Sequence, residues 1–233
     1  MNRSAVRLCW SVEFISRSNL EAFRSLVDAT SGEVLVRQNR TFRSDASYRV
    51  YTSDSPSPFS PGHSTPSSVQ PSLVARQLVT LDALSATASP EGWVHAGTDP
   101  QTIGNNVDGR AWRNLFGNPS PRPQATSRVF DFSLDLNQGP ETYTSAAVVN
   151  VFYWCNWMHD KLYDLGFTEA AGNFQDDNFG RGGLDGDRML AYAQAGADSG
   201  SANNAYYFPA PDGDSGQIFM FFSFKFEVRQ NGW

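Results

Sequence analysis

Histidine is the residue type in this chain best suited to bind a transition metal or to carry protons. The chain has three histidines, and they lie far apart in the sequence: His63, His95 and His159. A catalytic zinc takes three protein ligands and keeps one open position, and the helical form of such a site places two histidines about four residues apart. No two histidines here have that spacing, so the sequence predicts that this chain binds no catalytic zinc.

His159 is followed directly by Asp160 in a segment with helical periodicity. An imidazole beside a carboxylate is a candidate general base. The positions around the pair belong to an apolar helix face, and no third group of a suitable type is visible. We therefore interpret His159 and Asp160 as a structural pair, with a catalytic role as the alternative.

A glycine-rich loop holds four acids: Asp176, Asp177, Asp185 and Asp187. Several oxygen ligands on a flexible backbone can bind calcium, but the spacing fits no EF-hand. Asparagine and aspartate also stabilise turns by hydrogen bonds to nearby backbone amides. We interpret the four acids as part of a solvated loop, and calcium binding is the alternative.

Asp131 and Asp135 alternate with apolar residues in the segment 129–136. This alternation predicts a strand whose acids face water, so the two carboxylates are not interpreted as a glycosidase pair.

The charge is divided unevenly along the chain. Residues 1–50 hold eight arginines and five acids, whereas the remainder holds ten bases and nineteen acids. Binding to nucleic acid needs clustered Lys and Arg, and the acidic body has no basic stripe. Nucleic acid is therefore not an expected partner.

No segment reaches the length of about 18 apolar residues that a membrane span needs, so no membrane association is expected. The first residues are too short and too polar for the core of a signal peptide, and any targeting segment would lie upstream of Met1. Cys9 and Cys155 fall in segments of different character, and we interpret them as two buried free thiols.

Periodicity predicts an α+β fold. Strands are expected over 5–15, 46–51 and 129–136, and a strand, turn and strand over 27–35, with Gly32 supplying a positive φ. Residues 19–28 fit either a short helix or a strand. Prolines and serines dominate 53–72, which predicts a loop on the surface.

The strongest helix signal runs from Thr144 or Ser145, either of which can cap its first amides, to about Leu165. Gly166 stands where a helix commonly ends with a left-handed residue. Spacings of three and four predict one broad buried stripe along this helix, formed by Val148, Val151, Phe152, Cys155, Met158, Leu162 and Leu165.

Several blocks in and after this helix resemble the fungalysin family of secreted zinc metallopeptidases. The blocks are Phe152-Tyr153-Trp154, Met158-His159-Asp160, residues 163–175, residues 178–183, Asn203-Asn204-Ala205 and Asp212-Gly213. A looser likeness joins residues 27–35 to the end of the family's inhibitory propeptide and residues 46–51 to the start of its mature enzyme. After Phe222 the likeness stops, and the H-E-x-x-H zinc helix of the family is absent from this chain.

The resemblance implies three parts. Residues 1–45 are expected to be the C-terminal end of an inhibitory propeptide, and 46–222 the mainly β, loop-rich N-terminal lobe of the catalytic domain with one long amphipathic helix. Residues 223–233 form a tail without family resemblance. The family's zinc would need ligands that this chain lacks, so we expect this chain alone to be inactive.

The resemblance also implies where substrate binds. In similar peptidases an Asn-Ala step on an edge strand lines the cleft, and an extended substrate adds to it as a further strand. Asn204 and Ala205 match that step. A plain edge strand without a binding role is the alternative.

Two classes of function remain open. The first is a fragment of a secreted zinc metalloendopeptidase, with protein or peptide substrates and its own propeptide as partners. The second is a noncatalytic binding or inhibitory module, in which the basic N-terminal part associates with the acidic remainder. A third hypothesis is a free glycosidase or sugar-binding domain, based only on the aromatic residues Trp93, Trp112 and Trp154, which we interpret as core residues.

Overall fold

A computed structural model describes residues 6–15, 22–39, 46–52, 75–81, 84–95 and 97–222. The chain divides into two compact units, Met1–Ser44 and Asp45–Trp233, and each is described by itself. The serine- and proline-rich segment 53–72 and the tail 223–233 lie outside the described residues.

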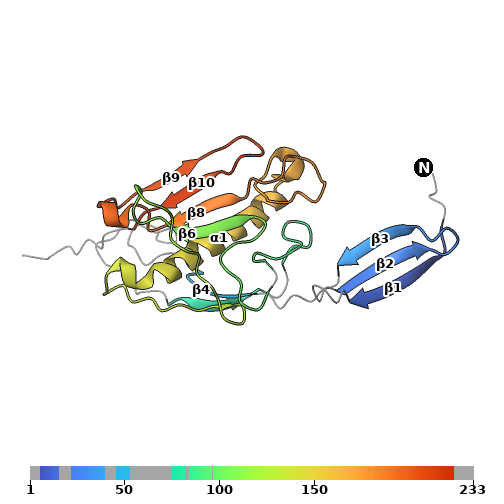
Figure 1. Ribbon diagram of the computed structural model, residues 1–233, viewed down its shortest axis with the longest axis horizontal. Helices are drawn as coiled ribbons and strands as arrows, with labels where there is room; N and C mark the ends of the chain where they lie inside the picture. Colours follow the sequence, from blue (N-terminus) through green and yellow to red (C-terminus); the bar gives the residue numbers. More distant parts are fainter. Residues whose placement is uncertain are drawn as a thin grey trace, which may run out of the picture. The chain divides into compact units, whose positions relative to one another are not determined.

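The first unit is an antiparallel sheet of three strands, with β2 in the centre (Figure 1). Its strands are β1 (Cys9–Ile15), β2 (Ala22–Asp28) and β3 (Val34–Asn39). Asp28 Oδ1 accepts the N–H groups of Thr30 and Ser31 in the turn between β2 and β3, and Gly32 has a φ of 77°. The predicted strand, turn and strand is confirmed, and the ambiguous segment 19–28 contains a strand.

The described residues of the second unit form two sheets. One sheet has the order β5-β4-β7, with β4 at Ser47–Val50, β5 at Gln77–Thr80 and β7 at Val129–Phe130. The other has the order β6-β8-β10-β9, with β6 at Val107–Ala111, β8 at Met189–Ala193, β9 at Ala205–Phe208 and β10 at Gln217–Met220. In this second sheet β6, β8 and β10 are parallel, and β9 is antiparallel to β10.

Helix α1 (Thr144–Asp164) lies between the two sheets and contacts β4, β6 and β8 (Figure 1). The core forms where the helix meets the sheets: Tyr48 and Phe130 stack with ring centroids 5.2 Å apart, and Phe152 packs beside them. Gly109 on β6 allows this approach, because a Cβ there would lie 3.1 Å from the side chain of Phe152. The α+β class, mainly β with one long helix, is confirmed.

The C-terminal end of α1 agrees with the sequence. Gly166 has a φ of 102°, its N–H donates to the carbonyl of Tyr163, and the N–H of Phe167 donates to that of Leu162. These two bonds form a Schellman motif. The predicted cap at the other end is wrong, because a 3₁₀ helix, Pro140–Tyr143, leads directly into α1 and no side chain caps its amides.

The prediction of one continuous buried stripe on α1 is wrong for its second half. The buried residues of the helix all lie between Ala146 and Asn156, where the sheets contact it. Met158, Leu162 and Leu165 are exposed, because none of the described residues covers that side of the last turns.

The predicted strand 129–136 is mostly wrong as well. Only Val129 and Phe130 pair with β4. Beyond them side chains take over the polar contacts: Arg49 binds Asp131 with two hydrogen bonds of 3.0 and 2.8 Å, and Arg76 donates to the carbonyl of Phe132. Of these contacts, only the one from Arg76 takes a backbone group of the segment, the carbonyl of Phe132.

Cys9 and Cys155 are free and half-buried, so the expected free thiols are found but neither residue is fully buried. Among the tryptophans assigned to the core, Trp93 is buried, whereas Trp112 and Trp154 are half-buried. No helix within the described parts of the chain is long and apolar enough to cross a membrane.

Candidate functional site

The edge of the four-stranded sheet is formed by β9, which pairs on one side only, with β10. All four residues of β9 are exposed. Continuing the register of β9 and β10 by one residue places Asn204 opposite Phe221. The N–H of Phe221 donates to the carbonyl of Asn204 over 3.1 Å, so these two residues form a hydrogen-bonded pair. Because such pairs alternate along an antiparallel ladder, the backbone groups of Ala205 and Tyr207 point away from β10 to the open edge.

The side chain of Asn204 occupies the first of these edge groups, the backbone N–H of Ala205. Its Oδ1 accepts the N–H of Ala205 over 2.8 Å, and its Nδ2 donates to the Tyr206 hydroxyl over 2.8 Å. The amide oxygen therefore stands where the carbonyl of an added strand would bind. An extended peptide can replace that contact and continue the sheet, as strands do at open edges.

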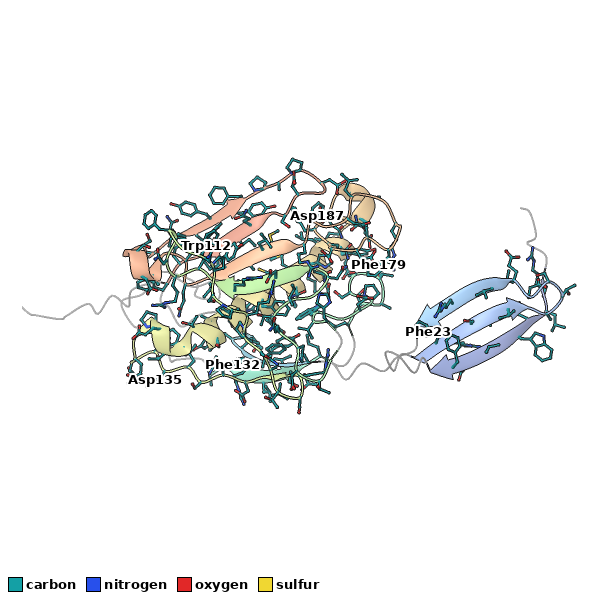
Figure 2. The ribbon with its side chains drawn as sticks, in the orientation of Figure 1. Phe23, Trp112, Phe132, Asp135, Phe179 and Asp187 are labelled. Atoms are coloured by element: carbon teal, nitrogen blue, oxygen red, sulfur yellow. The ribbon has the colours of Figure 1, made fainter. Side chains whose placement is uncertain are left out.

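An aromatic cluster covers one face of this half of the sheet. Tyr206 and Phe208 of β9 share that face with Phe219 of β10 and Tyr192 of β8, as the pairing register requires. The ring centroids of Phe208 and Phe219 are 5.7 Å apart, and those of Tyr192 and Phe219 are 4.9 Å apart. Trp112, labelled in Figure 2, completes the cluster at 4.9 Å from Tyr192. The edge strand is therefore held by ring contacts as well as by its ladder.

His159 and Asp160 belong to a different place, on α1. His159 Nδ1 lies 3.0 Å from Asp160 Oδ1, which also accepts the Ser89 hydroxyl at 2.6 Å. Asp160 Oδ2 accepts the Trp93 indole N–H at 2.9 Å, and Asn106 Nδ2 donates to the Ser89 hydroxyl. The carboxylate thus connects the helix to the loop that carries Ser89 and Trp93, and the structural interpretation of the His159–Asp160 pair stays a prediction.

The sequence did not identify Ser89 as a partner of Asp160, or Asn106 as the donor to Ser89. A signal was present, since Ser89 and Asn106 lie in the segments 88–93 and 104–107, which also resemble loops of the fungalysin family. Composition and spacing alone could not join them to a helix more than fifty residues further along the chain.

The acidic loop near the C-terminal end of α1 carries Phe179 and Asp187, both labelled in Figure 2. Asp187 is fully buried, and its two oxygens accept the N–H groups of Gln175 and Gly213. Burial raises the pKa of Asp187 above its ordinary value, against the effect of these two hydrogen bonds.

The other three acids of this loop also have partners in the protein. Asp185 accepts the N–H of Asn178, Asp177 accepts the N–H of Phe179, and Asp176 forms an ion pair with Arg188. The bond from Asp177 to the N–H of Phe179 is the local turn contact expected of an aspartate in a loop, and the other two join more distant parts of the loop. Asp135 similarly accepts the N–H of Asn137.

The implied zinc does not fit the described residues. No group of three or more His, Cys, Asp or Glu residues among them is placed to hold a metal ion. His95 Nε2 lies 3.3 Å from a guanidinium nitrogen of Arg188, and His159 Nδ1 lies against Asp160. His63 lies outside the described residues.

Comparison with known proteins gives one family. A family model described as Fungalysin metallopeptidase (M36) matches residues 62–232. Extracellular metalloproteinase 2 of Arthroderma otae is 33% identical over 225 residues, which cover 93% of this chain and 32% of that protein. Extracellular metalloproteinase MEP of Pyricularia oryzae is 29% identical over 222 residues, which cover 91% of this chain and 30% of that protein. The chain thus spans about a third of the length of these relatives.

Proposed function

Since this chain belongs to the fungalysin metallopeptidase family, we propose that it contributes the substrate-binding edge of a zinc-dependent metalloendopeptidase that hydrolyses internal peptide bonds. In this proposal a protein substrate binds in extended form along β9 and is held first at Asn204 and Ala205. The relatives are named extracellular metalloproteinases, which supports a secreted protein.

The observation that carries the proposal is the open edge of β9. Its backbone groups at Ala205 and Tyr207 point away from β10, and all four residues of the strand are exposed. An unpaired edge in a folded protein is a template for a further strand, and peptide recognition commonly uses it. The register then fixes which substrate amides face the protein.

We further propose that residues 1–45 are the end of an inhibitory propeptide and that 46–222 form the N-terminal lobe. The boundary between the two compact units, at Ser44 and Asp45, supports this division. The proposal assigns no hydrolytic step to the described residues, because their donor groups do not fit a zinc site.

Backbone methylation of a peptide ligand tests strand addition directly. We expect a labelled extended peptide to bind the 233-residue chain, with binding followed by fluorescence anisotropy. Methylating an amide nitrogen that faces β9 removes a ladder hydrogen bond, whereas methylating the next one along the peptide does not. Affinity should fall by roughly tenfold in the first case and little in the second. Equal effects at adjacent positions would contradict the proposal.

A protein variant gives the matching test. Tyr207→Pro removes an N–H that β10 does not use, so it should weaken peptide binding while the edge strand persists. Tyr207→Phe keeps that N–H and is the control.

A separate assay addresses catalysis. The 233-residue chain is expected not to cleave casein by itself. Casein cleavage that stops when a chelator is added would show that the chain holds a functional metal.

A further inference from the structure

The sheet of the first unit has an apolar face that no other described residue of that unit covers. The register places Val12 opposite Ser25 and Ser25 opposite Arg37, so these three side chains share one face. Other residues of this face are strongly exposed for apolar side chains: Trp10 is 67% exposed and Val34 is 57% exposed. A sheet with one apolar face normally buries it against another layer.

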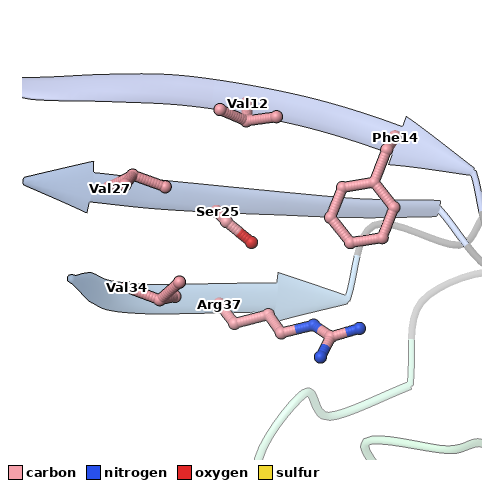
Figure 3. A pocket seen from close by; sticks show the side chains of 6 residues that line it. All are labelled: Val12, Phe14, Ser25, Val27, Val34 and Arg37. Carbon is pink, nitrogen blue, oxygen red and sulfur yellow. The ribbon is translucent and has the colours of Figure 1, made fainter. Parts of the chain in front are cut away.

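Side chains of all three strands form a shallow groove on this face, with a volume of about 340 Å³ (Figure 3). Its lining is Val12, Phe14, Ser25, Val27, Val34 and Arg37. Apart from Ser25 and Arg37, the side chains that line this open groove are apolar.

Arg37 supplies the charged group of the groove. Its guanidinium lies 4.2 Å from the ring centroid of Phe23 and 5.6 Å from that of Phe14. Among the residues that the structure describes, no carboxylate forms an ion pair with Arg37, and the contacts of its guanidinium there are with the faces of these two rings. A carboxylate approaching over the apolar face would find a planar donor suited to a bidentate contact.

The opposite face of the same sheet is more polar. Arg24 donates to the hydroxyl of Ser11 over 3.0 Å, and Asp28 lies 3.6 Å from Arg7. Val36 is exposed on that face to nearly the same extent as Val12 is on the apolar one, 41% against 43%. The two faces therefore supply matched pairs of residues for comparison.

We propose that the apolar face of the β1–β2–β3 sheet binds an amphipathic α-helix whose apolar side covers the groove and which places a carboxylate against Arg37. Strands lie about 4.8 Å apart, so three of them span roughly the 10 Å diameter of one helix. Residues 1–44 hold seven arginines and four acids, a net charge of 7 − 4 = +3, which favours an acidic partner. A second copy of the same face would carry the same positive charge and be repelled.

The test uses the whole 233-residue chain and a helical peptide of about 18 residues, with leucines at positions i, i+3 and i+7 and one glutamate at the edge of that stripe. Binding is followed by fluorescence anisotropy. We expect saturable binding that Arg37→Glu weakens by roughly tenfold and Arg24→Glu leaves nearly unchanged. A peptide with lysine in place of the glutamate should show the reverse preference and bind the Arg37→Glu protein better.

A second pair of variants tests the apolar contact. Val12→Lys should abolish peptide binding and Val36→Lys should not, with circular dichroism confirming that both proteins keep their strands. Equal effects of the two members of either pair would overturn the proposal.

Other occupants would give different results. If sedimentation shows a dimer that Val12→Lys dissociates, the face binds a second copy of this chain. If vesicles containing phosphatidylserine bind through Val12 and Arg37 while the peptide does not bind, the ligand is a membrane surface. Either result would overturn the proposed helical partner.

Discussion

The indole nitrogen of Trp93 donates a hydrogen bond of 2.9 Å to Oδ2 of Asp160, which joins a loop to the long helix of the second unit. The other oxygen of the same carboxylate receives the hydroxyl of Ser89. One helical side chain therefore holds two residues of a loop that has little regular structure of its own. The position of this loop therefore depends on its hydrogen bonds to Asp160 of α1 more than on contacts within the loop.

Removing that carboxylate should loosen the loop. In Asp160→Ala the Trp93 indole N–H and the Ser89 hydroxyl lose their acceptor in a largely buried place. Leaving a buried donor unpaired costs about 1–3 kcal/mol, so with two donors we expect the free energy of unfolding to fall by at least about 2 kcal/mol. Urea denaturation measures the change. Asp164→Ala, at an exposed position on the same helix, is the control and should have little effect. Similar losses in both variants would contradict the role given to Asp160.

The elements that the sequence predicted well are those specified by neighbouring residues. The end of α1 follows from Gly166 and Phe167, which lie next to the last turn, and the turn between β2 and β3 follows from Asp28 and Gly32. These contacts are local, so composition and spacing describe them.

The failed predictions involve contacts between distant segments. Segment 129–136 has the alternation of a strand, but only Val129 and Phe130 pair with a neighbouring strand, and Arg76 takes the backbone carbonyl of Phe132. The exposed end of α1 has the periodicity of a buried helix, and only the sheet arrangement shows where burial stops. The family resemblance singled out Asn204 and Ala205 as candidate substrate-binding residues. The open edge beside them could not be predicted, because it follows from the order of the strands in the sheet.

Gly104 should tolerate no side chain. A Cβ at this position would lie 2.1 Å from the backbone carbonyl oxygen of Trp93, which cannot rotate away. We expect Gly104→Ala to lower the free energy of unfolding by about 3 kcal/mol, because the two backbones must separate. At Gly180 a Cβ would meet nothing within 4 Å, although its φ is positive. Gly180→Ala should therefore cost only about 1 kcal/mol. Thermal unfolding of both variants would measure the difference, and equal shifts would contradict the steric argument.

Acid should weaken the second unit through Asp108. Arg122 binds this buried carboxylate with two hydrogen bonds of 2.6 and 2.7 Å. Burial alone would raise the pKa of Asp108, but the hydrogen bonds from Arg122 and Arg110 outweigh burial and hold that pKa below its ordinary value. A carboxyl whose pKa is lowered by folding stabilises the protein above its unfolded pKa of about 3.9, and this contribution is lost as the pH falls through the lower folded value.

The measurement is urea denaturation across the acid range. The native protein should be more stable than Asp108→Asn near neutral pH, and the gap should narrow below about pH 4. Asp214→Asn removes an exposed carboxylate that has no ion pair among the described residues, so it serves as the control. A gap that stays constant down to acid pH would show that Asp108 acts by packing and not by its charge.

The two thiols should differ in reactivity. Burial raises the pKa of Cys155 to about 12, so at about pH 8 only roughly one molecule in ten thousand carries its thiolate, the form that alkylating agents attack. Cys9 lies on β1, an edge strand of the first unit. We expect iodoacetamide to label Cys9 of the native chain and to leave Cys155 unlabelled, with peptide mass spectrometry locating the adducts. Labelling in concentrated guanidinium chloride, which should modify both residues, is the control. Labelling of Cys155 in the native chain as fast as Cys9 would mean that the helix around it opens far more often than its packing against the sheets implies.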